Sequence, residues 1–212
     1  MKRMLEMVSG ARVLALGAHP DDIELGAGGL VARLAREGAD VVMAIASVPT
    51  ENERRVKEAA EGARLLGARM KLLYAAEPCR VEDVPMHRLV ARLDEVVSEH
   101  KPHLVITHSA VDLHWDHRLV HHATVSALRR TPCDLLAFLS SPEMNAHSRA
   151  VGQCFADITD TIDLKLQAIA VHQTQMDRSK FDLGASRDLA RAMGRISGVK
   201  YAETYEVLRL TF

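Results

Sequence analysis

Near the N-terminus, one histidine and two aspartates, His19, Asp21 and Asp22, lie within four residues of one another. They follow an apolar run, residues 13–17, that predicts a buried strand. Two adjacent ionised carboxylates repel each other, and repulsion or burial raises a carboxyl pKa unless a cation offsets it. A divalent metal held by His19 and Asp22 would supply that cation and leave Asp21 free for proton transfer. The alternative is that Asp21 or Asp22 only caps the helix that follows.

A second segment rich in histidine and aspartate, His114 to His117, follows another predicted strand at residues 103–107. In a doubly wound sheet ordered 3-2-1-4-5, the first and fourth strands are neighbours, and ligands bind in the crevice outside their carboxyl ends. We therefore expect the two segments to face each other there. The candidate metal ligands are His19, Asp22 and His117, with His114 as the alternative donor.

Such a site predicts metal-assisted hydrolysis, most simply of an amide. Two histidines and one carboxylate form a common zinc set with an open fourth position, and Fe²⁺ or another divalent ion could occupy the same set. Bound zinc lowers the pKa of water from about 15.7 to about 7 and polarises a carbonyl. Asp21 is the candidate general base. A cationic His114 could stabilise the oxyanion or protonate a leaving amine, and Asp116 could orient a neighbouring imidazole.

The elements that must position these residues alternate between apolar runs and helical patterns, which is typical of βαβ units around a mostly parallel sheet. Strands are predicted at residues 12–17, 40–47, 70–75, 103–107, 135–139 and 203–210. Helices are predicted at residues 28–37, 51–66, 85–100, 117–130, 163–175 and 187–195. We expect a Rossmann-like α/β fold with helices on both faces of the sheet. Without a repeat or linker in the pattern, residues 1–212 are expected to form one domain.

Composition restricts the possible classes of protein. The 212 residues suffice for one sizeable core, and 27 basic against 28 acidic residues indicate neither a nucleic-acid nor an anionic membrane partner. No apolar run approaches the roughly 18 residues of a membrane span, and the N-terminal residues lack the apolar core of a signal peptide. Cys79, Cys133 and Cys154 are widely spaced and odd in number, which is typical of reduced thiols. A cytoplasmic protein is expected.

Two other enzyme classes are disfavoured by their motifs. Gly26, Gly28 and Gly29 do not form the six-residue dinucleotide pattern, and nearby carboxylates would repel a pyrophosphate. We interpret these glycines as sites of close packing between helix and strand. The Gly-x-Ser-x-Gly elbow of serine hydrolases is absent. His108, at the end of a predicted strand, is a further candidate for lining the crevice.

Taken together, the motifs resemble the zinc-dependent N-acetylglucosaminyl-phosphatidylinositol de-N-acetylase (PIG-L/LmbE-like) family. The specific matches are Ala18-His19-Pro20-Asp21-Asp22 and His114-Trp115-Asp116-His117. Weaker matches are residues 55–59 and 65–67, Lys165, His172, Gln175 and residues 201–203. Members of this family remove acetyl groups from N-acetylglucosamine-type sugars, including intermediates of mycothiol and bacillithiol synthesis.

The resemblance implies a role for each residue of the two motifs. It implies that His19, Asp22 and His117 ligate one zinc ion. Asp21 would be the general base, and His114 the electrophilic or acid group.

The resemblance also bears on two residues outside the ligand set. Arg55 matches a family arginine that contacts substrate, although a helix-surface salt bridge with Glu58 or Glu51 would equally account for it. Trp115 stands where proline is common in the family, which keeps the ligand spacing and is expected to alter the shape of the entrance.

We therefore expect a zinc-dependent N-deacetylase that releases acetate from an N-acetylglucosamine-type sugar or glycoside. Its expected partner is this small molecule, with no nucleic acid and no membrane span; family members often form homo-oligomers. One alternative is a metal-dependent hydrolase of a non-sugar amide or ester. Another is a non-catalytic metal- or sugar-binding homologue, which would not be expected to keep both Asp21 and His114.

Overall fold

The computed structural model describes residues 8–75, 79–139, 152–179 and 182–211, with the backbone alone for 177–179. Within these ranges the strands form a seven-stranded sheet in the order β3-β2-β1-β4-β5-β7-β6. The strands are β1 (Arg12–Gly17), β2 (Asp40–Ile45), β3 (Arg69–Leu72), β4 (Leu104–His108), β5 (Asp134–Phe138), β6 (Cys154–Asp157) and β7 (Ala202–Arg209). Strands β1 to β5 are parallel, whereas β7 runs antiparallel to both β5 and β6. The predicted order 3-2-1-4-5 is confirmed.

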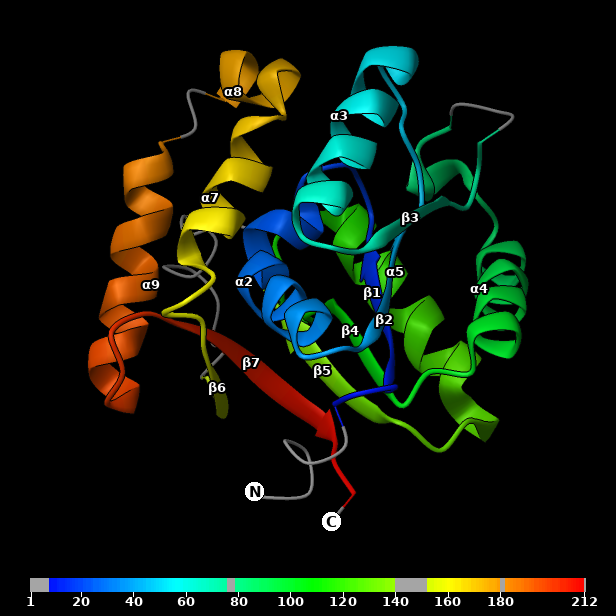
Figure 1. The fold of residues 1–212 in the computed structure, drawn as a ribbon. Coiled ribbons are helices and arrows are strands. Elements are labelled where there is room, and N and C mark those ends of the chain that lie inside the picture. Colours follow the sequence, from blue (N-terminus) through cyan, green and yellow to red (C-terminus); the bar gives the residue numbers. More distant parts are fainter. Residues whose placement is uncertain (1–7, 76–78, 140–151, 180–181, 212) are drawn as a thin grey trace.

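Helices cover both faces of this sheet (Figure 1). They are α2 (Asp22–Arg36), α3 (Asn52–Leu65), α4 (Met86–His100), α5 (Trp115–Ala127), α7 (Ile162–Ala170), α8 (Gln173–Ser179) and α9 (Leu183–Ser197), with short 3₁₀ turns at Val81–Asp83 and Leu128–Arg130. In the part of the chain that the structure describes, none of these helices is long and apolar enough to cross a membrane. The predicted α/β fold with helices on both faces is confirmed.

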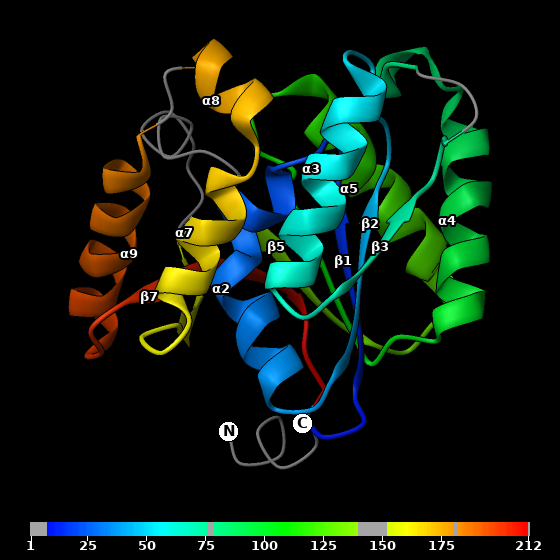
Figure 2. The ribbon, with the colours of Figure 1, turned by 45° about the horizontal axis from the view of Figure 1, so that its top comes forward.

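The alternation of side chains along β1 divides the core into two layers. Val13 and Ala15 pack with α2, α3 and α7 on one face. Leu14 and Leu16 pack with α4 and α5 on the other. Helix α9 packs against α7 and β7 beyond this central part, as Figures 1 and 2 show. Because β1 is buried on both faces from Val13 to Gly17, its register is strongly specified, and this fixes the position of the polar segment that follows it.

Helix α2 begins at Asp22, six residues earlier than predicted, so Gly26 is part of the helix instead of preceding it. A Cβ atom at Gly26 would lie 2.0 Å from Cδ2 of Phe138 in β5, so only glycine permits this approach of helix to strand. This supports the interpretation of Gly26 as a site of close packing. The early start also makes Asp22 the first residue of α2.

The C-terminal part differs from the sequence analysis in one helix and in one additional strand. The single helix predicted at residues 163–175 is wrong, since α7 ends at Ala170 and α8 begins at Gln173. The chain turns at His172, whose imidazole is buried against α2. Strand β6 was not predicted, because three partly buried residues and one exposed residue at the edge of a sheet carry little periodic signal.

Candidate metal and catalytic site

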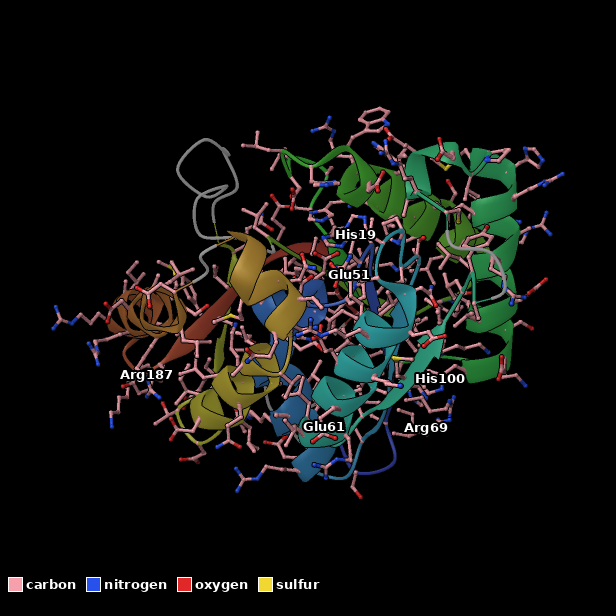
Figure 3. The ribbon with its side chains drawn as sticks, turned by 90° about the horizontal axis from the view of Figure 1, so that it is seen from above. His19, Glu51, Glu61, Arg69, His100 and Arg187 are labelled. Carbon is pink, nitrogen blue, oxygen red and sulfur yellow. The ribbon has the colours of Figure 1, made fainter. Side chains whose placement is uncertain are left out.

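The two polar segments lie together at the carboxyl ends of β1 and β4. These strands pair in parallel, from Val13 with Leu104 to Ala15 with Ile106, so both end at the same edge of the sheet. Figure 3 looks down on this edge and labels His19 near the centre of the view. The structure thus brings the His19–Asp22 segment next to the His114–His117 segment, as the topology predicted.

Asp21 occupies an unusual backbone conformation between β1 and α2. Its φ angle is +92°, and its side chain makes no capping hydrogen bond to α2. Such a conformation costs a non-glycine residue on the order of 1–3 kcal/mol and is typical of functional sites. The Oδ2 atom of Asp22 instead accepts a hydrogen bond from the His19 amide at 2.7 Å. Capping through its side chain therefore does not account for Asp21.

The carboxylate of Asp22 lies between two imidazoles. Its Oδ1 lies 3.3 Å from Nε2 of His117, and its Oδ2 lies 3.2 Å from Nε2 of His108. Burial alone would raise the pKa of Asp22, but the charge of His117 and its contact with the carboxylate hold it well below its usual value. Burial and the charge of His117 lower the pKa of His108 to about 4, so His108 is neutral and its Nε2 accepts the Ala18 amide at 3.0 Å.

His117 carries the positive charge of this cluster when no metal is bound. Although burial opposes it, Asp22 and Asp112 raise the pKa of His117 to about 10. Asp112 Oδ2 lies 3.0 Å from His117 Nδ1, an ion pair without the alignment of a hydrogen bond. This contact supports the imidazole from behind while Nε2 faces Asp22. A protonated imidazole against a buried carboxylate is an arrangement in which a divalent ion could replace the proton.

His19 is held in a similar way from the other segment. Its Nε2 lies 2.9 Å from Oδ2 of Asp116, and its Nδ1 lies 3.7 Å from Oδ2 of Asp22. The second oxygen of Asp116 accepts the Glu82 amide at 3.1 Å. Asp116 therefore contacts and orients an imidazole, leaving Nδ1 of His19 directed to the carboxylate of Asp22.

His114 differs from the cationic group that was expected. Burial and the charges of His117 and His19 lower its pKa, so the neutral imidazole is favoured. Its Nδ1 accepts the Asp116 amide at 3.1 Å, which leaves the proton of the neutral ring on Nε2. The ring stacks on that of His117 with centroids 4.5 Å apart. His114 is thus placed as a neutral hydrogen-bond donor.

The described residues offer two overlapping groups of three metal donors. One is His19, His114 and His117, and the other is Asp22, His108 and His117, each with donor atoms within 4.8 Å of one another. The ligand set expected from the sequence, His19, Asp22 and His117, combines residues of these two groups. It fits zinc in chemistry, because both imidazoles have a carboxylate against one nitrogen and direct the other toward Asp22.

Asp21 lies beside this cluster with a carboxyl group suited to proton transfer. Burial and the charge of Asp22 raise its pKa to about 7, while the charges of His172 and Arg55 act in the opposite direction. Arg55 is only 5% exposed, and its Nη2 donates to the carbonyl of Pro20 at 3.3 Å. The surface salt bridge considered for Arg55 is therefore wrong.

Two buried contacts beside the site were not predicted from the sequence. His172 Nε2 lies 3.0 Å from Glu24 Oε1, and Lys165 Nζ lies 2.6 Å from Glu203 Oε1. Lys165, His172 and Glu203 lie in segments that weakly match the family. That weak match was the only indication in the sequence that they are functional. The sequence indicated His108 more strongly, because this residue ends an apolar run at the sheet edge where Asp22 lies.

Comparison with known proteins identifies relatives of this chain. The family model described as GlcNAc-PI de-N-acetylase matches residues 14–128. The diacetylchitobiose deacetylase of Thermococcus kodakarensis is 28% identical, over 91% of this chain and 81% of that protein. A conserved Thermus thermophilus protein shares the fold with a TM-score of 0.79 and 23% identity, covering 95% of this chain and 96% of that one. The 4-carboxy-2-hydroxymuconate hydratase of Pseudomonas putida follows with a TM-score of 0.77 and 23% identity, covering 96% and 98%.

Proposed function

The chain belongs to the GlcNAc-PI de-N-acetylase family, and from that membership we propose that it is a zinc-dependent hydrolase that removes the acetyl group from an N-acetylglucosamine-type sugar or glycoside. The observation that carries the proposal is the meeting of His19, Asp22 and His117 at one sheet edge with Asp21 beside them. The name of the Thermococcus relative supports an N-acetylated sugar as the substrate class.

His19, Asp22 and His117 would hold the zinc ion. Once bound, zinc supplies a Lewis acid for the amide carbonyl and lowers the pKa of the attacking water. Asp112 and Asp116 hold the two imidazoles in orientation by their contacts with His117 and His19. An ion that needs both segments would bind only when β1 and β4 are paired, so binding and folding are expected to be linked.

Proton transfer falls to Asp21, and oxyanion stabilisation to His114. Asp21, unprotonated, accepts a proton as water attacks the acetyl carbonyl, and then returns it to the leaving nitrogen of the sugar amine. His114 donates its Nε2 hydrogen to the oxygen that becomes negative in the tetrahedral intermediate. A neutral donor suffices for that role, so the lowered pKa of His114 is compatible with it.

We further propose that residues 1–212 act as one domain in the cytoplasm, and that Arg55 contacts the substrate. Core residues pack on both faces of one sheet, which supports a single domain. Cys79, Cys133 and Cys154 are all unpaired, which supports a reducing compartment. The Nε atom of Arg55 is buried without a hydrogen-bond partner beside the Asp21 loop, which supports a role in binding a polar group of the substrate.

The test is a panel assay on zinc-reconstituted protein. N-Acetylglucosaminides should give free amine and acetate in one-to-one yield, with activity lost to a chelator and restored by Zn²⁺. Because a hydratase shares the fold, the panel includes unsaturated tricarboxylic acids, non-sugar amides and esters. Turnover of one of these without acetate release from any sugar would refute the sugar assignment.

A further inference from the structure

Three exposed apolar side chains lie close together in the sequence, between the end of β4 and the first residue of α5. They are Val111, Leu113 and Trp115, which are 44%, 51% and 52% exposed, and we call this group the apolar rim. The other large apolar side chains that the described ranges expose are scattered over four elements: Met86 in α4, Val125 in α5, Ile196 in α9 and Leu208 in β7. Exposed apolar residues that stand alone are normal on protein surfaces. The apolar rim is different, because three of them lie within five residues of one another.

The apolar rim alternates along the chain with residues of the site. Asp112, His114 and Asp116 contact the imidazoles of the metal and catalytic cluster. Leu113 and Trp115 lie between them in sequence, and both are half-exposed. A single segment thus presents polar side chains to the reacting centre and apolar ones to solvent beside it.

Trp115 is held in place even though it is exposed. The guanidinium carbon of Arg118 lies 4.9 Å from the centroid of its ring. Arg118 is itself fixed, because its Nη1 donates to the carbonyls of Asp112 at 2.7 Å and Leu113 at 3.0 Å. A cation–π contact from an anchored arginine restricts the indole and leaves part of its surface open. An ordered aromatic surface binds an apolar group at a low cost in side-chain entropy.

We infer that the apolar rim binds an apolar aglycone, an alkyl or aryl group on the anomeric carbon of the N-acetylated sugar. This inference rests on the proposed function, because the acetamide must enter the cluster that adjoins the rim. Trp115 is then a specificity-determining residue of this chain. A second copy of the chain is the less suitable occupant, since three half-exposed side chains offer far less than the roughly 800 Å² per partner of a stable interface.

Trp115 is the only tryptophan of the chain, so its fluorescence reports on the apolar rim directly. The probes are N-acetylglucosamine, its octyl β-glycoside and octyl glucoside, all below micellar concentrations, added to zinc-loaded Asp21→Asn protein to prevent turnover. The octyl β-glycoside of N-acetylglucosamine should shift the emission to shorter wavelength and bind about tenfold or more tightly than N-acetylglucosamine. Octyl glucoside, without the acetamide, should bind more weakly.

The second test uses the Trp115→Ala variant. Its binding is measured by calorimetry in the Asp21→Asn protein, and its kinetics are measured in protein that keeps Asp21. Its KM for the octyl β-glycoside should rise about tenfold while kcat stays near the wild-type value, and both constants for N-acetylglucosamine should change little. The matched control is Ile196→Ala, which removes an apolar side chain of α9 that is 68% exposed. This variant should leave KM and kcat unchanged for both substrates.

Three results would overturn the inference. They are an unchanged affinity for the octyl β-glycoside in Trp115→Ala, equal binding of octyl glucoside, and a fluorescence change that follows protein concentration with a dimer in sedimentation. The last would assign the apolar rim to a second copy. If no acetate is released but the difference between the ligands persists and is lost in Trp115→Ala, the apolar rim stands and the proposed chemistry fails.

Discussion

Lys165 and Glu203 form a buried ion pair that binds the backbone of α2 from outside. The Nζ atom of Lys165 lies 2.6 Å from Glu203 Oε1 and also donates to the carbonyl of Leu25 at 2.8 Å. The two oxygens of Glu203 accept the amides of Gly29 and Leu30, each at 2.8 Å. In a regular α-helix the amide of Gly29 pairs with the carbonyl of Leu25, so the ion pair engages both partners of one helical bond.

This contact links the C-terminal segments to the start of the site. Helix α2 begins at Asp22, so a change in the position of its second turn is transmitted to a candidate metal ligand. The hydroxyl of Tyr205 also donates a hydrogen bond to Glu203 Oε2 at 2.7 Å, so a second residue of β7 takes part in this cluster. We therefore expect Lys165 and Glu203 to act as positioning residues for α2.

Removing one partner of this pair should destabilise the protein strongly. Glu203→Ala leaves a buried ammonium and two backbone amides without their acceptor, and Lys165→Met leaves a buried carboxylate. Each change should cost about 3–5 kcal/mol in the free energy of unfolding, and the double variant less than the sum. Urea denaturation measures the loss, and hydrogen exchange should show faster opening at residues 22–30.

The control for this prediction is the pair of Lys71 and Glu99, which lies on the surface. Lys71→Met should change the unfolding midpoint little, because solvent screens exposed ion pairs. Equal losses at both sites would contradict a special role for the buried pair.

Replacement of His117 should affect zinc binding much more than replacement of His114. His117→Ala removes the imidazole that belongs to both donor groups and should abolish stoichiometric zinc binding. His114→Ala should largely keep it. Equilibrium dialysis followed by metal analysis checks this, with circular dichroism to confirm folding. A fully loaded His117→Ala protein, or equal loss in both variants, would refute the ligand assignment.

Asp21→Asn should separate metal binding from proton transfer. The amide keeps the size of the side chain and cannot accept the proton, so zinc should stay bound while kcat falls by roughly 10²–10⁴-fold. Steady-state kinetics on a substrate found in the panel assay measures the change. Wild-type kcat in this variant would mean that another group activates the water.

His172 should make the stability of the metal-free protein depend on pH. Burial lowers its pKa, but the hydrogen bond and charge of Glu24, with the charges of Asp21 and Glu58, raise it above the ordinary 6.5. A folded-state pKa above the unfolded value stabilises the protein fully below about pH 6.5, and this contribution is lost as the pH rises through the folded-state pKa.

The measurement compares wild type with His172→Gln at several pH values. The difference in free energy of unfolding should be largest at acidic pH and shrink toward alkaline pH. His87→Gln, in the exposed first turn of α4, controls for the loss of one surface histidine. A difference that grows with pH would contradict the raised pKa.

Much of the architecture was determined by the sequence itself. The buried run of β1 and the alternation of strands and helices carry a local periodic signal, and the general rule for doubly wound sheets converts it into the order of the first five strands. The same rule brings His19 and Asp22 to the edge where His114 and His117 follow β4. The residues of each segment are close in sequence, so their spacing alone indicated the chemistry.

The contacts among these side chains depend on the assembled fold. The contacts of Asp22 with His108 and of Lys165 with Glu203 join residues far apart in the chain, and no local pattern encodes such a distance. The protonation of His114 depends on the charges around it. The buried position of Arg55 depends on the loop between β1 and α2, where the carbonyl of Pro20 accepts its hydrogen bond. Burial and charge are properties of the assembled fold, because each follows from every neighbour that excludes water from the group.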